Sequence, residues 1–236
     1  MVKYAIPFYL PVFLDRILIF PLLLLRRLWF GYAFRRIKLA NCAQYAIVEP
    51  GDYAELCKYT WWSDYSYGSY RAIRFVGKDR GHTALQMHRQ IMSMINPKFE
   101  TLNPKQIQNS NVRNSKERLV IDHINRNSLD NRRANLRIAT GLQNARNRVK
   151  INKKCSSIYK GVCWSKHHKK WAVQINDRKT SIHLGYFDDE IEAAKVYDAA
   201  AKKYHKEFAC LNFPPVDKRG LKNLFKYWLH RRERRE

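Results

Sequence analysis

The chain has 236 residues, enough for one large domain or for two small domains that each bury a core. It carries 45 lysines and arginines against 20 aspartates and glutamates, a formal net charge of +25, so a polyanion such as nucleic acid or an anionic membrane is the expected partner. The five cysteines form no Cys-x-x-Cys pair, and their odd number argues against a secreted disulfide framework and favours a reducing compartment.

The N-terminal segment is apolar and then basic. Residues Tyr4–Leu25 are almost wholly apolar over the length of a membrane span, but Asp15, Arg16 and three prolines interrupt them. Three interpretations stay open: an interfacial or packed segment, a membrane anchor, and a stretch that is not translated because the start codon lies further on. Membrane contact through residues 4–25 is expected to be secondary to the main function.

A β-rich lead-in follows this segment. Short alternating runs such as Tyr45–Val48 and Tyr70–Phe75 are typical of strands. Residues Ala84–Met94 have Leu85, His88, Ile91 and Met92 at helical spacing, which predicts a helix, and residues 96–118 have the composition of a polar loop. We expect the histidine of this helix to pack or to contact a phosphate.

Two reactive residues end the next predicted strand. The apolar run Leu119–Ile121 stops at Asp122 and His123, and a loop rich in asparagine, aspartate and arginine follows. A hard cation such as Mg²⁺ prefers oxygen ligands, keeps positions open for water and phosphate, and polarises a scissile phosphate. An imidazole titrates near neutrality and can take a proton from attacking water. The pair therefore indicates phosphodiester hydrolysis without a covalent nucleophile.

A second strand and a helix are expected to complete this unit. Leu136–Ile138 is typical of a short strand, and Thr140 and Gln143 have the spacing of a capping box that opens a helix. Asn144 then falls in the first turns of that helix. The order strand, loop, strand, helix brings its amide near the end of the first strand.

The stretch Ile121–Asn147 resembles the HNH homing-endonuclease motif in its His-Asn-Asn variant. His123, Asn135 twelve positions later and Asn144 nine beyond match the three signature positions. The resemblance implies a ββα-metal fold, with His123 as general base, Asp122 and Asn144 as ligands of one divalent ion, and Asn135 as a structural residue that holds the loop by a hydrogen bond. An asparagine at the last position gives an all-oxygen ligand pair, so Mg²⁺ or Mn²⁺ is the expected ion. The alternative is that Asp122 and His123 only cap a turn.

The C-terminal part predicts three strands and a helix. The alternating runs are Ile158–Trp164, Trp171–Asn176 and Ser181–Phe187, and Asp188 is expected to cap the helix that follows. One face of that helix is predicted from apolar spacing, and its members are Ile191, Ala194, Tyr197, Ala201 and Tyr204.

The same part resembles the Apetala-two/ethylene-response-factor DNA-binding domain. It contains the elements Tyr-x-Gly-Val, Leu-Gly-x-Phe, Ala-Ala-x-x-Tyr-Asp-x-Ala-Ala and Asn-Phe-Pro. The resemblance implies a three-stranded sheet that lies in the major groove of duplex DNA. Alternation independently places Lys170, Ala172, Gln174 and Asn176 on the face away from the helix if Trp171, Val173 and Ile175 pack against it. The predicted DNA contacts are Lys160, Trp164, Lys166, Lys170, Gln174 and His183.

These patterns predict an α+β protein with a β-rich lead-in, a ββα-metal nuclease fold and a three-stranded antiparallel sheet packed on one helix. The favoured function is a site-directed DNA endonuclease of the homing type, from a phage or another mobile element, that acts on double-stranded DNA in the cytoplasm or nucleoid without a small-molecule cofactor.

The alternatives are a non-cleaving DNA-binding regulator and a membrane-tethered protein whose basic residues bind anionic lipid; a zinc site built from Cys155, Cys163, His167 and His168 is a weaker option. The predicted parts are an N-terminal segment (1–36), a nuclease domain with its lead-in (37–150), a linker (151–155), a DNA-binding domain (156–214) and a basic tail (215–236).

Overall fold

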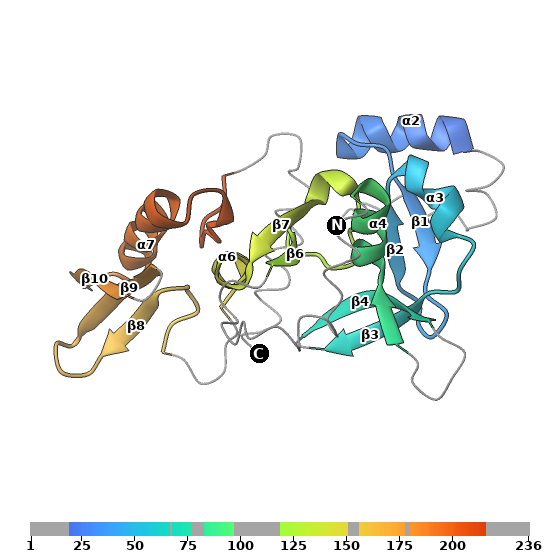
Figure 1. Ribbon diagram of the computed structural model, residues 1–236. Coiled ribbons are helices and arrows are strands. Elements are labelled where there is room, and N and C mark those ends of the chain that lie inside the picture. The colour runs from blue at the N-terminus through green and yellow to red at the C-terminus, as the bar shows by residue number, and fades with distance from the viewer. Residues whose placement is uncertain are drawn as a thin grey trace. The chain divides into compact units, whose positions relative to one another are not determined.

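The computed structural model divides the chain into two compact units, each made of small antiparallel sheets and helices (Figure 1). The first unit contains the described residues before position 97 together with Asn127–Leu136. The second unit contains residues 119–126 and 137–215. The mixed α+β class is therefore as predicted. The structure describes residues 19–66, 68–76, 83–96, 119–150, 156–177 and 180–215. Residues 1–18, the predicted linker 151–155 and the tail after 215 lie outside this range.

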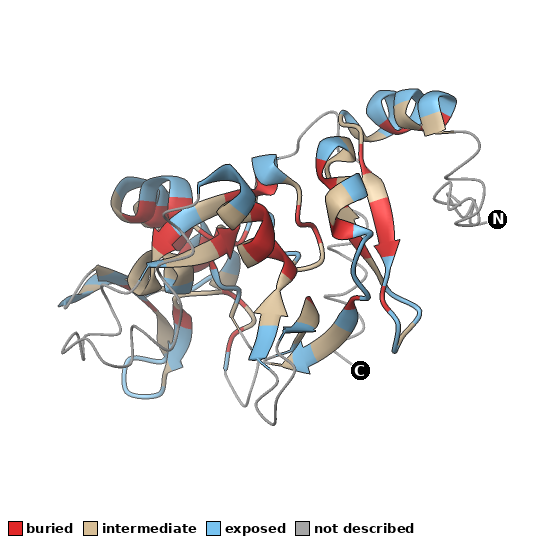
Figure 2. Cartoon of the chain, turned by 45° about the vertical axis from the view of Figure 1, so that its right-hand side comes forward, coloured by how far each residue is buried: buried red, intermediate tan, exposed pale blue. Residues whose placement is uncertain are grey.

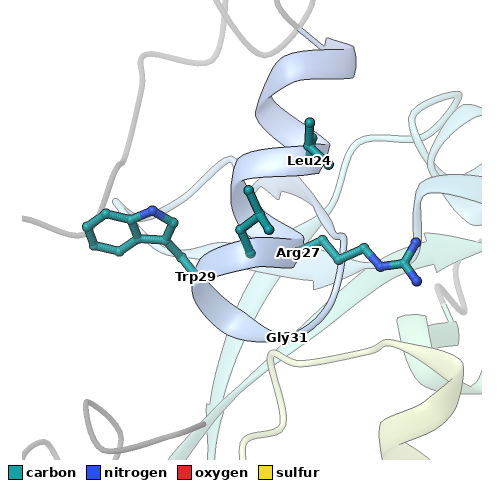
Figure 3. A pocket seen from close by; sticks show the side chains of 5 residues that line it. Leu24, Arg27, Trp29 and Gly31 are labelled. Carbon is teal, nitrogen blue, oxygen red and sulfur yellow. The ribbon is translucent and has the colours of Figure 1, made fainter.

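Helix α2 (Ile19–Phe30) is the first element of this unit in the described part of the chain. Leu22 and Arg26 are buried on its inner side, and the Arg26 guanidinium donates a 2.8 Å hydrogen bond to the carbonyl oxygen of Phe34. Leu24, Leu28 and Trp29 are exposed apolar side chains, and Figure 3 shows Arg27 projecting from the helix on the side away from Trp29. Within the described residues, no helix has both the length and the apolar character that crossing a membrane requires.

A small two-stranded sheet and a helix follow. Strand β1 (Arg35–Lys38) pairs antiparallel with β2 (Tyr45–Val48), which confirms the strand predicted there. Helix α3 (Pro50–Leu56) begins with a proline, whose fixed φ and missing N–H suit the first turn. The core of this region is apolar and almost inaccessible to solvent; its members are Leu39, Ala46, Val48, Leu56 and Trp61.

A three-stranded antiparallel sheet completes the lead-in. It consists of β3 (Trp62–Ser66), β4 (Ser69–Val76) and β5 (Thr83–Gln86), in that order. Helix α4 (Met87–Ile95) follows β5 directly. The predicted helix therefore begins later than expected, because residues 84–86 pair with β4 as a strand. His88 and Ile91 are buried on α4, as the helical spacing predicted.

The predicted nuclease segment has the expected order of elements. Strands β6 (Leu119–His123) and β7 (Leu136–Thr140) form a two-stranded sheet, and the 3₁₀ turn η2 (Arg133–Asn135) precedes β7. Helix α6 (Gly141–Asn147) follows β7 at once. Its capping box is confirmed: Gln143 N donates to Thr140 Oγ1, and Thr140 N donates to Gln143 Oε1.

The C-terminal part is a three-stranded antiparallel sheet with one helix, as predicted. Strand β9 (Lys170–Asp177) lies between β8 (Val162–Ser165) and β10 (Thr180–Phe187). Helix α7 (Glu190–His205) and the turn η3 (Lys206–Phe208) follow. The first strand is shorter than expected and begins at Val162.

The cap of α7 is one residue later than predicted. Asp189, and not Asp188, accepts hydrogen bonds from the backbone N–H groups of Ile191 and Glu192, at 3.2 and 3.0 Å. The helix therefore starts one position further on. Ile191 is 46% exposed, so it does not belong to the buried face as predicted.

The core of this part lies between the sheet and α7. Val173 and Ile175 of β9 are buried against the helix, and α7 has a buried side and an exposed side (Figure 2). Burial raises the pKa of Tyr197 well above its ordinary value. Gly161 has a φ of +78°, and a Cβ there would lie 1.9 Å from Cδ2 of Tyr197. The close packing of the Tyr197 ring on the backbone therefore requires the glycine of the Tyr-x-Gly-Val element.

Candidate active site and nucleic-acid interface

Asp122 and His123 stand at the end of β6 and are both buried, with 5% and 9% of their surface exposed. The chain turns immediately afterwards, and the N–H of Arg126 donates to the carbonyl oxygen of His123 at 2.8 Å. Arg126 has a positive φ of 65°, a conformation that is uncommon outside glycine. The strand thus ends at a sharp turn in two consecutive residues, one with a carboxylate and one with an imidazole.

Two donors fix the carboxylate of Asp122. The guanidinium of Arg137, on β7, contacts Oδ2 through Nε at 2.9 Å and Nη2 at 2.8 Å. The side-chain amide of Asn147, at the end of α6, donates to both carboxylate oxygens at 3.0 Å. Charge-assisted hydrogen bonds of this kind are strong and directional, so they set the orientation of Asp122.

Asn147 also connects the helix to the strand end. Its Nδ2 lies 3.0 Å from the carbonyl oxygen of His123, and only 5% of the residue is exposed. The sequence interpretation missed this residue. A signal was present, because Asn144 and Asn147 lie three positions apart on a predicted helix and therefore on the same side of it.

Asn144 lies in the middle of α6 and is partly buried. Because it shares a side of the helix with Asn147, which bonds Asp122, the helix brings its amide toward the end of β6. The geometry is compatible with the predicted ligand pair, and the assignment of Asn144 as a ligand stays a prediction.

Asn135 lies in the first unit, where it closes the loop that follows residue 126. Its Nδ2 donates a 2.7 Å hydrogen bond to the carbonyl oxygen of Asp130, and the residue is 5% exposed. The carboxylate of Asp130 pairs in turn with Arg132, whose guanidinium carbon lies 3.3 Å from the centre of the Tyr32 ring. The internal hydrogen bond of Asn135 is of the kind that a loop-holding residue needs.

The β-rich lead-in is the support of this loop. The N–H of Ile47, on β2, donates to the carbonyl oxygen of Leu129 at 2.7 Å, and the N–H of Asn131 donates back to Ile47 at 2.7 Å. The hydroxyl groups of Ser69 and Ser128 lie 2.7 Å apart. The lead-in is therefore an integral part of the first unit and holds the loop by its backbone.

An ion pair between the buried Asp52 and the partly exposed Arg133 was also missed. Asp52, on α3, is 1% exposed, and Arg133 Nε lies 2.9 Å from its Oδ2 and 3.1 Å from its Oδ1. The hydrogen bond to Asp52 raises the pKa of Arg133. No sequence spacing links these residues, since 81 positions separate them.

The donor set at the end of β6 fits a hard divalent ion. The predicted ligands Asp122 and Asn144 carry oxygen atoms, which Mg²⁺ and Mn²⁺ prefer, and the predicted base His123 follows Asp122 in the chain. Among the described residues, no group of three or more histidine, cysteine, aspartate or glutamate side chains gathers as a metal site. A site there would consequently rest on one carboxylate, one amide and solvent.

The outward face of the C-terminal sheet is rich in aromatic and imidazole rings. His183 of β10 pairs with Gln174 of β9 in the register of the sheet, and both are exposed. The ring of Tyr186 lies 4.6 Å from that of His183 and 4.0 Å from that of His168. A bulge between His183 and Gly185 brings these rings to one face.

The basic residues of this part occupy different environments. Lys166 is exposed in the turn between β8 and β9. The ammonium of Lys170 lies 3.0 Å from Oδ2 of Asp188, with 44% of the Lys170 side chain and 83% of the Asp188 side chain exposed. An ion pair this open to solvent contributes little to stability, so it leaves Lys170 free to exchange partners.

Two of the predicted DNA contacts have other partners. Lys160 donates its ammonium to the carbonyl oxygens of Arg146 at 2.6 Å and Arg148 at 2.7 Å, and burial lowers its pKa. It caps the end of α6 and does not point outward. Trp164 pairs with Trp171 across the strands, with 5.0 Å between the ring centres, and 40% of Trp164 is exposed. The assignment of both residues as DNA contacts stays a prediction.

Comparison with known proteins identifies the same two regions. Residues 114–146 match the family model described as HNH endonuclease, and residues 157–207 match the one described as AP2 domain. The chain therefore combines an HNH endonuclease domain with a C-terminal AP2 domain, as the sequence patterns predicted.

Three curated relatives match about a quarter of this chain. An AP2/ERF and B3 domain-containing protein of Oryza sativa subsp. japonica is 44% identical over 59 residues, 25% of this chain and 16% of its own. An AP2-like ethylene-responsive transcription factor of Arabidopsis thaliana is 36% identical over 74 residues, 27% of this chain and 17% of its own. An AP2/ERF and B3 domain-containing transcription factor, also from Arabidopsis thaliana, is 38% identical over 61 residues, 26% of this chain and 17% of its own. The matches thus span about a sixth of the relatives.

Proposed function

We propose that this chain is a site-directed DNA endonuclease of the homing type, which hydrolyses phosphodiester bonds with one divalent ion, Mg²⁺ or Mn²⁺, and His123 as general base. The observation that carries the proposal is the buried carboxylate of Asp122, oriented by Arg137 and Asn147 beside His123. Asp122, His123 and Arg137 lie in the segment that matches the HNH endonuclease family model, and Asn147 follows it directly. Metal-assisted hydrolysis needs an oxygen ligand for the ion and a base for the attacking water, which a carboxylate and an imidazole can supply.

In this proposal each residue has one task. The imidazole of His123 takes a proton from water as the water oxygen forms a bond to phosphorus and the bond to the leaving oxygen breaks. Asp122 and Asn144 would hold the ion, and Asn135 holds the loop through the carbonyl of Asp130. A bound divalent ion would polarise the phosphate and stabilise charge on the leaving oxygen.

The C-terminal sheet is proposed to read duplex DNA with its outward face. Gln174 and His183 lie opposite each other on that face and are exposed, and an amide can make two hydrogen bonds to an adenine edge. Lys166 and Lys170 lie at the same end of the sheet and are proposed to contact phosphate groups. The relatives named as transcription factors match in this part of the chain, which supports a DNA-binding role.

The cellular setting belongs to the same proposal. We expect the gene to be part of a phage or another mobile element, because homing endonucleases of this type are usually encoded by such elements. The protein would then act in the cytoplasm or at the nucleoid. Contact of residues 4–25 with a membrane stays a separate prediction, of which only residues 19–25 fall in the described part of the chain.

Plasmid cleavage tests the nuclease directly. Supercoiled plasmid that carries the DNA flanking the gene is incubated with the full chain, with and without Mg²⁺. The expected result is Mg²⁺-dependent conversion to nicked or linear DNA, which His123→Ala and Asp122→Asn abolish. Asp64→Asn is the matched control, because Asp64 pairs with Arg71 on the lead-in sheet. Equal cleavage by His123→Ala would remove the histidine from the mechanism.

A non-cleaving DNA-binding regulator is the second candidate. Two of the three relatives favour it, since they are named as transcription factors and residues 157–207 match the AP2 domain model. Tight, salt-dependent DNA binding without any Mg²⁺-dependent conversion of plasmid would establish this function in place of the first.

A further inference from the structure

One side chain joins the candidate active site to the C-terminal domain. Arg137, on β7, contacts Oδ2 of Asp122 through Nε and Nη2, at 2.9 and 2.8 Å. Its Nη1 donates a 2.8 Å hydrogen bond to the carbonyl oxygen of Glu207, in η3. Its guanidinium carbon lies 3.9 Å from the centre of the Phe208 ring. Arg137 thus links a proposed metal ligand to the turn after α7.

The three contacts at position 137 require the side-chain chemistry of arginine. The guanidinium is a planar fork with five N–H donors, so one edge can bind a carboxylate while the other edge binds a carbonyl. Its flat face also packs on an aromatic ring. The side chain of Arg137 is 16% exposed, and all three contacts are made at once. A lysine has one charged centre and cannot reproduce this arrangement.

The two carboxylate oxygens of Asp122 accept different numbers of hydrogen bonds. Oδ2 accepts from Arg137 and from Asn147, so its acceptor capacity is used. Among the described residues, the hydrogen bond that Oδ1 accepts comes from Asn147, at 3.0 Å. A carboxylate oxygen has two lone-pair sites, so Oδ1 keeps one of them for another partner.

We infer that Arg137 is a positioning residue of the nuclease: it occupies Oδ2 of Asp122, leaves Oδ1 to meet the divalent ion, and is itself held by Glu207 and Phe208 of the C-terminal domain. The inference rests on the proposed nuclease function. It gives the AP2 domain a second task besides binding DNA, because its final turn sets the orientation of a ligand in the active site.

The inference predicts opposite changes in metal binding and in cleavage. Arg137→Gln removes a positive charge beside Asp122 and releases Oδ2, so a divalent ion binds about fivefold more tightly. The carboxylate then loses its fixed orientation, and cleavage slows about 100-fold, as small misplacements of catalytic groups do. A purely structural role would weaken metal binding and cleavage together.

The test measures both quantities on the full chain. Mn²⁺ binding is followed by the electron paramagnetic resonance signal of the free ion, and plasmid cleavage is measured with Mn²⁺ on the same samples. Arg146→Gln is the matched control, since Arg146 is 15% exposed and pairs with Asp177, which is not a proposed ligand. Phe208→Leu keeps apolar volume but removes the ring face, and we expect slower cleavage with Mn²⁺ affinity within about twofold of the unchanged chain.

Each outcome decides a separate claim. Tighter Mn²⁺ binding with slower cleavage in Arg137→Gln, and neither change in Arg146→Gln, supports the inference. Unchanged or weaker Mn²⁺ binding in Arg137→Gln overturns it while the unchanged chain still cuts DNA. Full cleavage by Phe208→Leu overturns the task given to the C-terminal turn. If the unchanged chain neither binds Mn²⁺ nor cuts DNA, the proposed nuclease function fails first, and the inference fails with it.

Discussion

Replacement of Gly161 by alanine tests the packing that positions the C-terminal sheet. At Gly161 φ is +78°, and an added Cβ would lie 1.9 Å from Cδ2 of Tyr197 and 2.9 Å from the carbonyl oxygen of Gln174. The left-handed backbone costs a residue with a side chain about 1 kcal/mol or more. Overpacking a close contact adds about 1–3 kcal/mol. Gly161→Ala should therefore destabilise this domain by about 2–4 kcal/mol.

Gly68→Ala separates the two contributions. Gly68 has almost the same φ, +77°, and nothing lies within 4 Å of its added Cβ. Gly68→Ala should therefore lower the free energy of unfolding only by the cost of the left-handed backbone, about 1 kcal/mol. Hydrogen–deuterium exchange, read on peptides from each part of the chain, gives the local free energy of opening for both variants. If both variants lose the same free energy of opening, the ring of Tyr197 moves aside without a free-energy cost. That result would refute the packing argument.

Four further perturbations follow from the described contacts. Arg133→Ala leaves the buried carboxylate of Asp52 without its partner and should lower the free energy of unfolding by about 2 kcal/mol, measured by urea titration; a loss near zero would mean that water replaces the pair. Asn147→Asp places a second carboxylate against Asp122 and should slow cleavage at least about tenfold while DNA affinity, measured by fluorescence anisotropy, stays the same; weaker DNA binding would argue for a folding defect. Lys166→Ala should reduce the slope of log affinity against log salt by about 1, whereas Lys160→Ala should leave that slope unchanged, because its ammonium is bound to carbonyl groups. Burial lowers the pKa of His205, so just below the ordinary pKa of histidine the unfolded chain binds more protons than the folded chain. The contribution of His205 to stability is therefore complete above the ordinary pKa of histidine and is lost as the pH falls. A urea midpoint that does not change between pH 7.5 and 5.5 would contradict this.

Periodicity and local signals were sufficient to predict most of the elements. The strand that ends in Asp122 and His123, the capping box of α6 and the three strands and helix of the C-terminal domain were all predicted from local signals, since alternation and Thr-x-x-Gln spacing act over a few residues. The start of α4 was wrong, because tertiary pairing with β4 turns residues 84–86 into a strand although their apolar spacing also suits a helix.

The partners of the site residues were much harder to predict. Arg137 and Asn147 fix Asp122, and Asp52 binds Arg133. The fold brings these partners together, and no regular spacing in the sequence links them. Lys160 shows the same difficulty for a charged side chain. It is a predicted DNA contact, and in the structure its ammonium donates to the carbonyl oxygens of Arg146 and Arg148 at the end of α6. Charge alone does not show whether a lysine faces a phosphate or a carbonyl group.

The central claim is that this chain binds DNA with one part and cuts it with another, and one paired measurement tests it. DNA affinity and the Mg²⁺-dependent rate of strand cleavage are determined on the same preparations of the full chain and of His123→Ala, with the flanking DNA of the gene as substrate. The proposed function predicts equal affinity in both proteins and cleavage in the unchanged chain alone. Equal affinity with no cleavage by either protein would contradict the nuclease and leave a DNA-binding regulator.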